Sequence, residues 1–238
     1  MRFLKQREAL AIDKDLVEKY KFTIPQLMEL AGLSASHAVY DRYKPKEFSK
    51  VLVCTGPGHN GGDGFVVARN LKLMGYEVSI FCPKEGQAEY LKNLYAQMPF
   101  FEIKVFSEIS VFEDKLKENS YNLIIDAIFG FSFKPPLRPP FDTVVSLLSA
   151  SKCPICSIDV PTGWLVDVKK NESELDHSIC IQPETIVCLT GPKVCIESCV
   201  GRTVYLGGRF VPPEMVKEYG MDYPPYPQEK LIIKLDIK

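Results

Sequence analysis

Short apolar segments alternate with helical segments along most of this chain, and this alternation limits the fold more than any other feature. The predicted strands are apolar throughout, and they cover residues 50–55, 77–82, 102–106, 122–128, 155–160, 185–190 and 203–206. The predicted helices between them cover residues 62–74, 87–98, 112–119 and 141–150. Strands of this kind are typical of a parallel sheet that helices cover on both sides. The sequence therefore predicts an α/β fold of three layers, in which a mostly parallel sheet lies between helices.

We expect the 238 residues to form a single domain with three parts. Residues 1–45 contain two N-terminal helices, residues 50–208 form the core, and residues 209–238 form a C-terminal tail. Because the tail is rich in proline, we expect it to be irregular and to lie on the surface.

The two N-terminal helices are predicted from apolar spacing and from a capping signal. The first covers residues 3–21, where apolar residues recur at helical spacing. The second begins after Thr23, an N-cap residue, with Pro25 in its first turn, and it continues towards Tyr43. Within the core, residues 166–183 are predicted to form a polar connection.

The composition excludes several classes of protein. A content of 46% hydrophobic and 25% charged residues is ordinary for a globular chain, and a net charge of −1 does not attract nucleic acid. No apolar run approaches the roughly 20 residues of a membrane helix, so we expect no membrane partner. The first residues contain no apolar signal core, so we expect a cytoplasmic protein, with a mitochondrial form as the alternative. We interpret all eight cysteines as reduced thiols, including Cys153 and Cys156, which no second pair accompanies at zinc-ligand spacing.

A glycine-rich segment follows the first predicted strand and leads into a helix: Gly56-Pro57-Gly58-His59-Asn60-Gly61-Gly62-Asp63-Gly64. Such a turn lets the backbone approach an anionic ligand at the helix N-terminus. We expect a side chain at Gly61 or Gly62 to intrude on the volume of that ligand. A dinucleotide dehydrogenase would also carry an acidic residue about 20 positions further on, to hold the ribose. The second strand ends in Phe81-Cys82-Pro83-Lys84 instead, which argues against an ordinary NAD dehydrogenase.

Two further strands each carry an aspartate near the carboxyl end. Asp126 lies in the apolar segment 122–128, and Asp159 closes the segment 155–160 before a Pro-x-Gly turn. A carboxylate in an apolar strand is costly unless it is paired, hydrogen-bonded or bound to a metal ion. The residues after Asp126 include three phenylalanines and the cations Lys134 and Arg138, which suit a planar ring and phosphate groups. Because ligands of such sheets bind beyond the carboxyl ends of the strands, we expect one site there.

Taken together and in order, these segments resemble the NAD(P)HX epimerase family, also called the YjeF N-terminal domain family. The glycine loop is similar to its G-P-G-x-N-G-G-D-G signature. Residues 126–134 and 157–164 are similar to its second and third motifs, and residues 26–32 to its N-terminal helical motif. Residues 206–213 and 223–227 resemble the tail of eukaryotic members. The resemblance covers nearly the whole chain.

The resemblance implies a Rossmann-like fold, a homodimer, and an enzyme that interconverts the (6R) and (6S) forms of hydrated NADH and NADPH, alongside a partner NAD(P)HX dehydratase. It implies a bound potassium ion held by Asn60, Asp126 and Thr162, whose oxygen donors suit a hard cation. The implied substrate-binding residues are His59, Asn60, Gly61, Gly62, Asp63, Gly130, Phe131, Ser132, Phe133, Lys134, Pro135, Pro136 and Asp159.

The chain departs from the family pattern at three places. His59 stands where Asn is common, Thr162 where Ser is usual, and Pro135-Pro136 where many animal members have Gly-Asp. Threonine keeps the hydroxyl of the serine, whereas the proline pair changes the loop that would close on the substrate.

We expect Asp159 to be the catalytic acid and base, and Lys134 to be a second candidate that orients the hydroxyl or binds phosphate. Two alternatives remain. YjeF-like domains also serve as non-catalytic scaffolds or protein-binding modules, although a scaffold does not need both strand-end aspartates and the full glycine loop. A kinase-like dehydratase would need a second domain or a P-loop, and this sequence contains neither.

Overall fold

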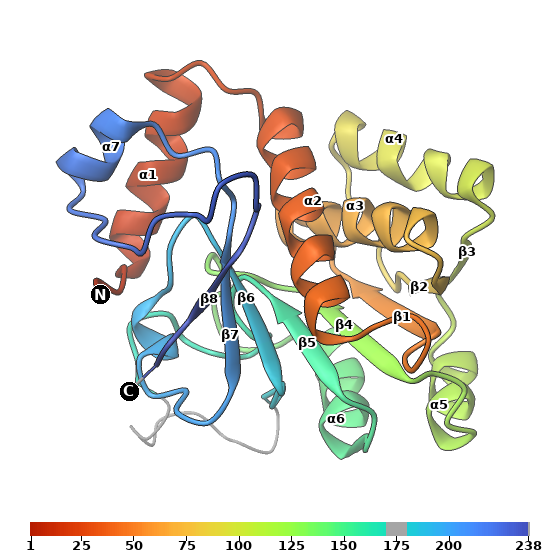
Figure 1. Cartoon of the computed structure of the whole chain (residues 1–238). Helices are drawn as coiled ribbons and strands as arrows, with labels where there is room; N and C mark the ends of the chain where they lie inside the picture. Colours follow the sequence, from red (N-terminus) through yellow and green to blue (C-terminus); the bar gives the residue numbers. More distant parts are fainter. Residues whose placement is uncertain (170–179, 238) are drawn as a thin grey trace.

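The computed structural model describes residues 1–169 and 180–237, and these residues build one sheet with helices on both sides (Figure 1). The strand order is β3-β2-β1-β4-β5-β6-β7-β8. All neighbouring strands are parallel except β7 and β8, which are antiparallel. The strands are β1 (Lys50–Thr55), β2 (Glu77–Phe81), β3 (Lys104–Phe106), β4 (Leu123–Ala127), β5 (Ile155–Ile158), β6 (Thr185–Leu189), β7 (Thr203–Gly207) and β8 (Ile233–Leu235). The predicted α/β class with a mostly parallel sheet is confirmed.

The helices form the two outer layers and one additional wall. In Figure 1, α2, α3 and α4 lie above the sheet, α5 and α6 lie below it, and α1 and α7 lie together beyond the β6–β8 side. The bounds are α1 (Gln6–Glu18), α2 (Ile24–Arg42), α3 (His59–Leu73), α4 (Glu89–Gln97), α5 (Ile109–Lys117), α6 (Phe141–Ala150) and α7 (Pro213–Glu218), with short 3₁₀ helices η1 (Met98–Phe101) and η3 (Val194–Ile196).

The central strands bury side chains on both faces because successive residues of a strand point to opposite sides. On β1, Val51 and Val53 belong to the core beneath α2, α3 and α4. Leu52 and Cys54 belong to the core that includes Phe112 of α5 and side chains of α6. This two-sided burial is the physical reason for the apolar runs in the sequence.

The strand order reverses between β1 and β4. The chain leaves β1 for β2 on one side, whereas β4 pairs with the other side of β1 and continues to β5. Connections that leave neighbouring strands in opposite directions open a crevice at the carboxyl ends of these strands, which is where ligands of such sheets bind.

The N-terminal helices follow the prediction closely. On α1, Ala9, Ile12 and Leu16 form the buried stripe. On α2, the Thr23 hydroxyl accepts a hydrogen bond from the Gln26 backbone N–H at 3.3 Å, so Thr23 is the N-cap that the sequence indicates.

Helix α3 begins three residues earlier than predicted, at His59 instead of residue 62. The Gly62 N–H donates to the carbonyl oxygen of Gly58 at 3.1 Å, so the glycine segment is already helical there. The glycines suggested an extended turn, but the close packing of this helix requires some of them inside its first turns. As a result, residues 59–63 lie at the helix N-terminus and not in a preceding loop.

The prediction that the tail is irregular and superficial is wrong in two places. Residues 213–218 form α7, with Pro213 in its first turn, and residues 233–235 form β8 on the edge of the sheet. Met215 and Met221 are buried against α1, and Ile233 and Leu235 are buried beside β7. The signals were present: proline is favoured in the first turn of a helix, and Ile233-Lys234-Leu235 alternates in polarity.

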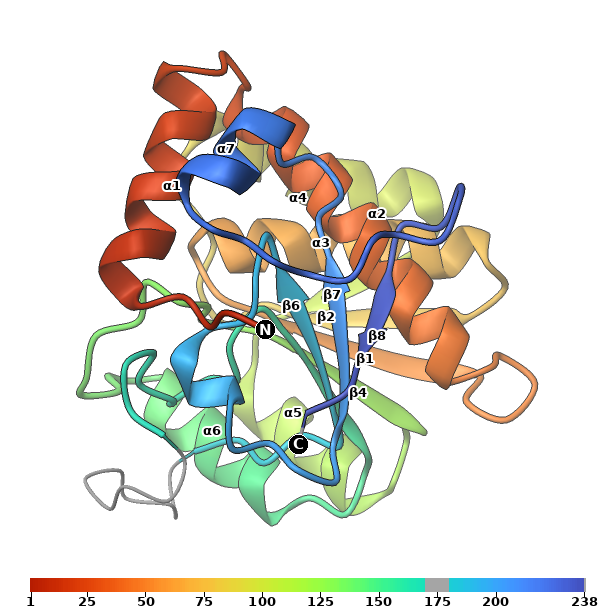
Figure 2. The same cartoon turned by 60° about the vertical axis from the view of Figure 1, so that its left-hand side comes forward.

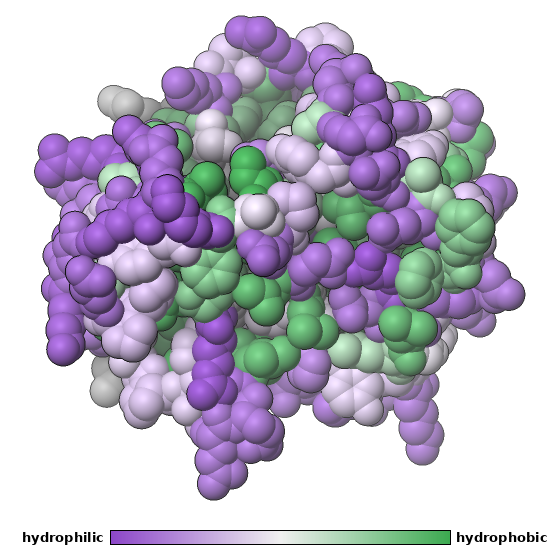
Figure 3. All heavy atoms as spheres, turned by 90° about the horizontal axis from the view of Figure 1, so that it is seen from above, coloured by the Kyte–Doolittle hydropathy of each residue, from purple (hydrophilic) through white to green (hydrophobic). Residues whose placement is uncertain are grey.

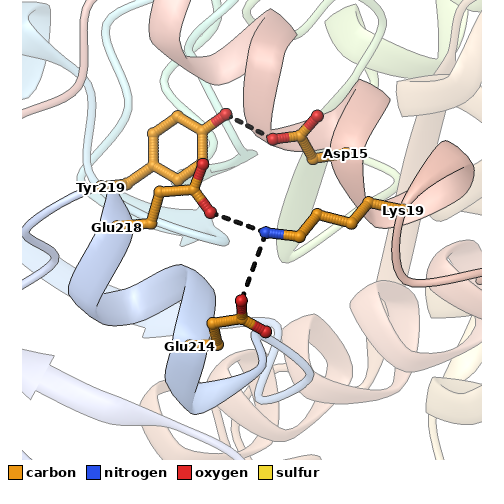
Figure 4. A network of polar contacts seen from close by, with 5 residues as sticks. All are labelled: Asp15, Lys19, Glu214, Glu218 and Tyr219. Carbon is orange, nitrogen blue, oxygen red and sulfur yellow. Dashed lines mark hydrogen bonds and ion pairs between the residues drawn. The ribbon is translucent and has the colours of Figure 1, made fainter.

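Helix α7 lies alongside α1 (Figure 2), and polar contacts tie the tail to α1 (Figure 4). The Lys19 ammonium, at the C-cap of α1, lies 2.9 Å from a carboxylate oxygen of Glu218 and 3.5 Å from one of Glu214. The Tyr219 hydroxyl donates to Asp15 at 2.7 Å. Both ends of the chain therefore form one wall, which we call the α1–α7 wall.

The surface seen from above carries hydrophilic side chains around its outline and apolar ones towards its middle (Figure 3). Exposed apolar residues of the N-terminal helices are Leu10, Leu30 and Tyr40. Among the described residues, no helix combines the length and apolarity of a membrane span. All eight cysteines are free. Residues 170–179 of the predicted polar connection lie outside the described residues.

We predict that Met215→Ala lowers the free energy of unfolding by about 2–4 kcal/mol, because it leaves a cavity between α7 and α1. Met215 is fully buried. Urea unfolding followed by circular dichroism measures the change. Lys217→Ala, on the exposed side of the same helix, is the control and should stay within about 0.5 kcal/mol of wild type. Equal stability of the two variants would mean that α7 does not pack on α1.

Candidate functional site

The three segments singled out in the sequence meet at the carboxyl edge of the sheet. The glycine segment leaves β1, the Asp126 segment belongs to β4, and Asp159 follows β5. These three strands are neighbours in the order β1-β4-β5. The Gly56 N–H donates to the Ala127 carbonyl oxygen at 3.2 Å, which joins the first two segments. The expected common site is therefore present as a geometric arrangement.

Asp126 is fully buried, and its carboxylate accepts a dense set of hydrogen bonds. The donors are the Ser157 hydroxyl at 2.7 Å, the Thr162 hydroxyl at 2.7 Å, the Thr162 N–H at 3.0 Å and the Ile128 N–H at 3.3 Å. Burial raises the pKa of this carboxyl, and the hydrogen bonds partly counter that rise. Asp126 therefore links the ends of β4 and β5 and the turn that follows β5.

Asp159 lies directly after β5 with a φ of 69°, a left-handed conformation that is uncommon outside glycine. Its side chain is buried. One carboxylate oxygen accepts the Phe131 N–H at 2.8 Å, and the other lies 2.5 Å from the Lys193 ammonium. The surrounding structure thus holds the carboxylate in one orientation, as a group with a chemical task requires.

Lys193 is the residue that sequence reasoning missed. It is almost completely buried, and besides Asp159 it contacts the Leu189 carbonyl oxygen at 2.9 Å. Burial alone would lower the pKa of its ammonium, but the charge of Asp159 and the hydrogen bond to it raise that pKa overall. The available signal was its place in Gly191-Pro192-Lys193, four residues after the end of the buried strand β6.

Lys134, the predicted second catalytic group, does not lie beside Asp159. It is exposed in the loop after β4, and in the described part of the chain no hydrogen bond or ion pair joins it to that aspartate. The cation next to Asp159 is Lys193. Sequence order could not separate the two lysines, because residue 134 is closer in the chain but residue 193 is closer in space.

Most of the predicted substrate-binding residues line two adjoining cavities. The larger has a volume of about 420 Å³ and lies between the strand ends and helices α1 and α2. The smaller, of about 370 Å³, lies beside the loop after β4 and is lined by Lys134 and Arg138. Both cavities share His59, Asn60, Gly130 and Ser132. Of the other predicted residues, Asp63, Phe131 and Asp159 line the larger cavity. The smaller cavity is lined by Phe133, Lys134 and Pro136, whereas Gly61, Gly62 and Pro135 line neither cavity.

The expectation that a side chain at Gly61 or Gly62 would enter the ligand volume is wrong. A Cβ atom at Gly61 would lie 1.8 Å from the Gly56 carbonyl oxygen, and one at Gly62 would lie 2.4 Å from the sulfur of Met28. These glycines let α3 pack against the loop and against α2. By contrast, a Cβ at Gly130 would lie 2.7 Å from Asp159 Oδ2, so this glycine leaves room at the carboxylate.

Asn60 carries the clearest sign of a missing ligand. Its amide oxygen and nitrogen are both buried, and neither has a hydrogen-bond partner among the residues that the structure describes. A buried polar group without a partner costs about 1–3 kcal/mol. Thr162, whose hydroxyl donates to Asp126 and lies 3.3 Å from the Phe129 carbonyl oxygen, adds further oxygen atoms at this edge. Oxygen donors of this kind suit an alkali cation.

Asp63 adds a second carboxyl group to the larger cavity. Burial raises its pKa well above the ordinary value, and the nearby charges of Asp159 and Asp13 raise it further, whereas Lys193 lowers it. His59, at the start of α3, contacts the Tyr90 hydroxyl at 2.9 Å. No cluster of three or more His, Cys, Asp and Glu with metal-binding geometry occurs in residues 1–169 and 180–237.

Comparison with known proteins agrees with this geometry. Residues 25–195 match the family described as YjeF-related protein N-terminus. Proteins named NAD(P)H-hydrate epimerase from Anopheles darlingi and Anopheles gambiae are each 43% identical to this chain, over 99% of it and 100% of the relative. The crystal structure of yeast ynu0, YNL200c, has a TM-score of 0.89 and 39% identity, over 99% of this chain and 100% of the yeast chain. The chain therefore belongs to the YjeF-related N-terminal domain family.

Proposed function

We propose that this chain interconverts the (6R) and (6S) forms of hydrated NADH and NADPH. The names of its full-length insect relatives support this activity. The observation that carries it is the buried Asp159 carboxylate, which Lys193 and the Phe131 N–H hold at the floor of a cavity of about 420 Å³. Enzymes commonly use a buried carboxylate of fixed orientation in a concave site to transfer protons.

The two cavities match the two chemical parts of the substrate. We place the hydrated nicotinamide ring in the larger cavity, whose lining is largely apolar and also includes carboxyl groups and Lys193. We place phosphate groups in the smaller cavity, where Lys134, Arg138 and the N-terminus of α3 offer positive charge. His59, Asn60, Gly130 and Ser132 line both cavities, so the ligand would cross between them there.

The reaction requires only the exchange of a hydroxyl group for water at C6. The ring nitrogen expels the hydroxyl, which leaves as water once it gains a proton, and water then adds to the opposite face and loses a proton. The carboxylate of Asp159 accepts or returns such a proton, and its negative charge stabilises the cationic ring between the two steps. The ammonium of Lys193, 2.5 Å from one oxygen of this carboxylate, fixes its direction.

We further propose a potassium ion held by Asn60, Asp126 and Thr162. The unpartnered amide of Asn60 supports a ligand at this point, and the three side chains supply oxygen donors. When bound, the ion supplies a fixed positive charge that balances buried carboxylate charge. Asp126 and Thr162 themselves join the end of β4 to the turn after β5 through their hydrogen bonds.

Three other parts of this proposal rest on the family resemblance and on composition. They are a homodimer, a dehydratase partner that acts on the same hydrated nucleotides, and a cytoplasmic or mitochondrial location. The eight free thiols support a reducing compartment.

We expect Asp159→Asn to lower the rate of epimerisation by roughly 10²-fold or more, because the amide neither accepts nor returns the proton. The measurement follows the conversion of purified (6R) and (6S) substrate by chromatography. Asp114→Asn, on the exposed surface of α5, is the matched control and should behave as wild type. A wild-type protein without epimerase activity would point to a non-catalytic scaffold instead, and a fully active Asp159→Asn would remove this residue from catalysis.

We expect potassium chloride to raise the melting temperature of wild type by about 3 °C relative to choline chloride at equal ionic strength, because a ligand of the native state stabilises it by mass action. Asn60→Ala should lose this response without a large loss of stability, since the amide has no partner in the described residues. The control is Asn93→Ala, on the exposed side of α4. An unchanged potassium response in Asn60→Ala would rule out this ligand set.

A further inference from the structure

The larger cavity contains a carboxyl group that the strand-end motifs do not supply. Asp13 lies on α1 and lines this cavity. Ala9 stands four residues before it and Leu16 three residues after it, so all three lie on the same side of the helix. The Asp13 side chain is half-buried and lines the cavity together with Asp159, Asp63 and Lys193. Asp13 therefore reaches the cavity from the α1–α7 wall, whereas Asp159 reaches it from the end of β5.

Asp13, like Asp63, differs from Asp126 and Asp159 because its carboxyl group has no hydrogen-bond or ion-pair partner in the described residues. Asp126 accepts four hydrogen bonds, and Asp159 is paired with Lys193 and Phe131. Across residues 1–169 and 180–237, the Asp13 side chain makes no ion pair and no hydrogen bond. Because it lines the cavity and no protein group occupies its oxygen atoms, the Asp13 carboxyl group is free to contact a ligand there.

The surroundings of Asp13 also suit a group that gains and loses a proton. Burial raises the pKa of its carboxyl to about 6; the charge of Lys193 lowers it and that of Asp159 raises it. The charged and titratable groups that line the same cavity are Lys14 on α1, His59 and Asp63 on α3, Asp159 after β5 and Lys193 after β6. Lys193 is paired with Asp159, so Asp13 does not have this cation to itself.

We propose that Asp13 is a second catalytic residue of the epimerase, exchanging a proton on one face of C6 while Asp159 exchanges a proton on the other. This inference rests on the proposed function. Inversion at C6 requires that oxygen leaves one face of the ring and that oxygen adds to the opposite face. Two carboxyl groups from different walls of one cavity meet that requirement, whereas a single fixed carboxylate faces one side only.

The protons balance without any other reactant. In one direction, the Asp13 carboxyl gives its proton to the hydroxyl on C6, the C6–O bond breaks, and water leaves as the ring nitrogen forms a double bond to C6. A water molecule on the other face then adds to C6, and its proton passes to the Asp159 carboxylate. The reverse direction uses the same steps in the opposite order. Between turnovers, solvent water returns the proton from one carboxyl group to the other.

The α1–α7 wall explains how Asp13 is kept in place. Asp15, two residues further along α1, accepts the Tyr219 hydroxyl, and Lys19 at the helix end contacts α7. These contacts, together with buried Met215, hold α1 against the tail (Figure 4). The C-terminal tail therefore fixes the position of a group that acts in the cavity.

The test compares Asp13→Asn with wild type and with Asp114→Asn, the exposed change on α5 that lies outside the cavity. We expect Asp13→Asn to lower kcat by roughly 10²-fold in both directions, with KM changed only a few-fold. In wild type, kcat/KM should fall as pH rises through about 6, because the pair then loses the one proton it must carry. This fall in kcat/KM near pH 6 should be absent in Asp13→Asn and present in Asp114→Asn.

A melting curve at pH 7 checks that the variant is folded. Because the pKa of Asp13 is raised in the folded state, its ionised form destabilises the protein above that pKa, so Asp13→Asn should melt at the same temperature or higher. Asp13→Ser, which removes the carboxyl group in a smaller side chain, is the second variant and should show the same kinetic loss.

Each remaining outcome counts against the proposal. If wild type is active, Asp159→Asn is inactive and Asp13→Asn keeps its kcat, the proposed function stands and Asp13 is not catalytic. If Asp13→Asn is slow but its kcat/KM still falls as pH rises through about 6, Asp13 only positions other groups. If wild type does not epimerise its substrate, both this inference and the proposed function are wrong.

Discussion

The site depends on one buried carboxylate in the middle of the sheet. Asp126 is tolerated inside β4 because hydroxyl and N–H donors surround it, from Ser157 on β5, Thr162 in the following turn and Ile128 in the next loop. Ser157 and Thr162 bracket Asp159 in the chain, so the same hydrogen bonds that make Asp126 acceptable also fix the backbone on both sides of Asp159. A structural requirement of the sheet thereby positions the proposed catalytic group.

Acidic groups outnumber the buried cation at the larger cavity. Three carboxyl groups line it with one buried lysine, and that lysine is committed to Asp159. Burial raises the pKa of Asp63 well above its usual value, and it raises the pKa of Asp13 to about 6. Carboxyl groups of the same chemical type therefore hold their protons differently because their surroundings differ, which is how proteins assign acid and base roles.

The cavity is enclosed by segments that are remote in sequence. The ends of parallel strands are open unless another element covers them, and here α1 does so from the N-terminus. The tail holds α1 through buried methionines and through the contacts of Lys19 and Asp15. Residues near position 15 and near position 218 thus act together, and neither segment is near the glycine loop in the chain.

The sequence by itself determined the fold class and most of the elements. Apolar runs indicated the parallel strands because both faces of the central strands are buried, and Thr23 indicated the start of α2 because its hydroxyl caps the helix. The meeting of the glycine segment, Asp126 and Asp159 also followed, since the carboxyl ends of neighbouring parallel strands lie at one edge.

Tertiary structure alone decided which charged groups face each other. Lys134 is near Asp126 in the chain but lies in the outer loop, whereas Lys193 reaches Asp159 from the segment after β6. Gly61 and Gly62 suited a ligand loop in the sequence, yet their missing side chains make room for Gly56 and Met28. Periodicity reports which face of an element is buried, but it does not report which other element covers that face. Only the tertiary structure decides the partner of Asp159, the position of Asp13 and the packing of the tail, because all three depend on contacts between residues far apart in the chain.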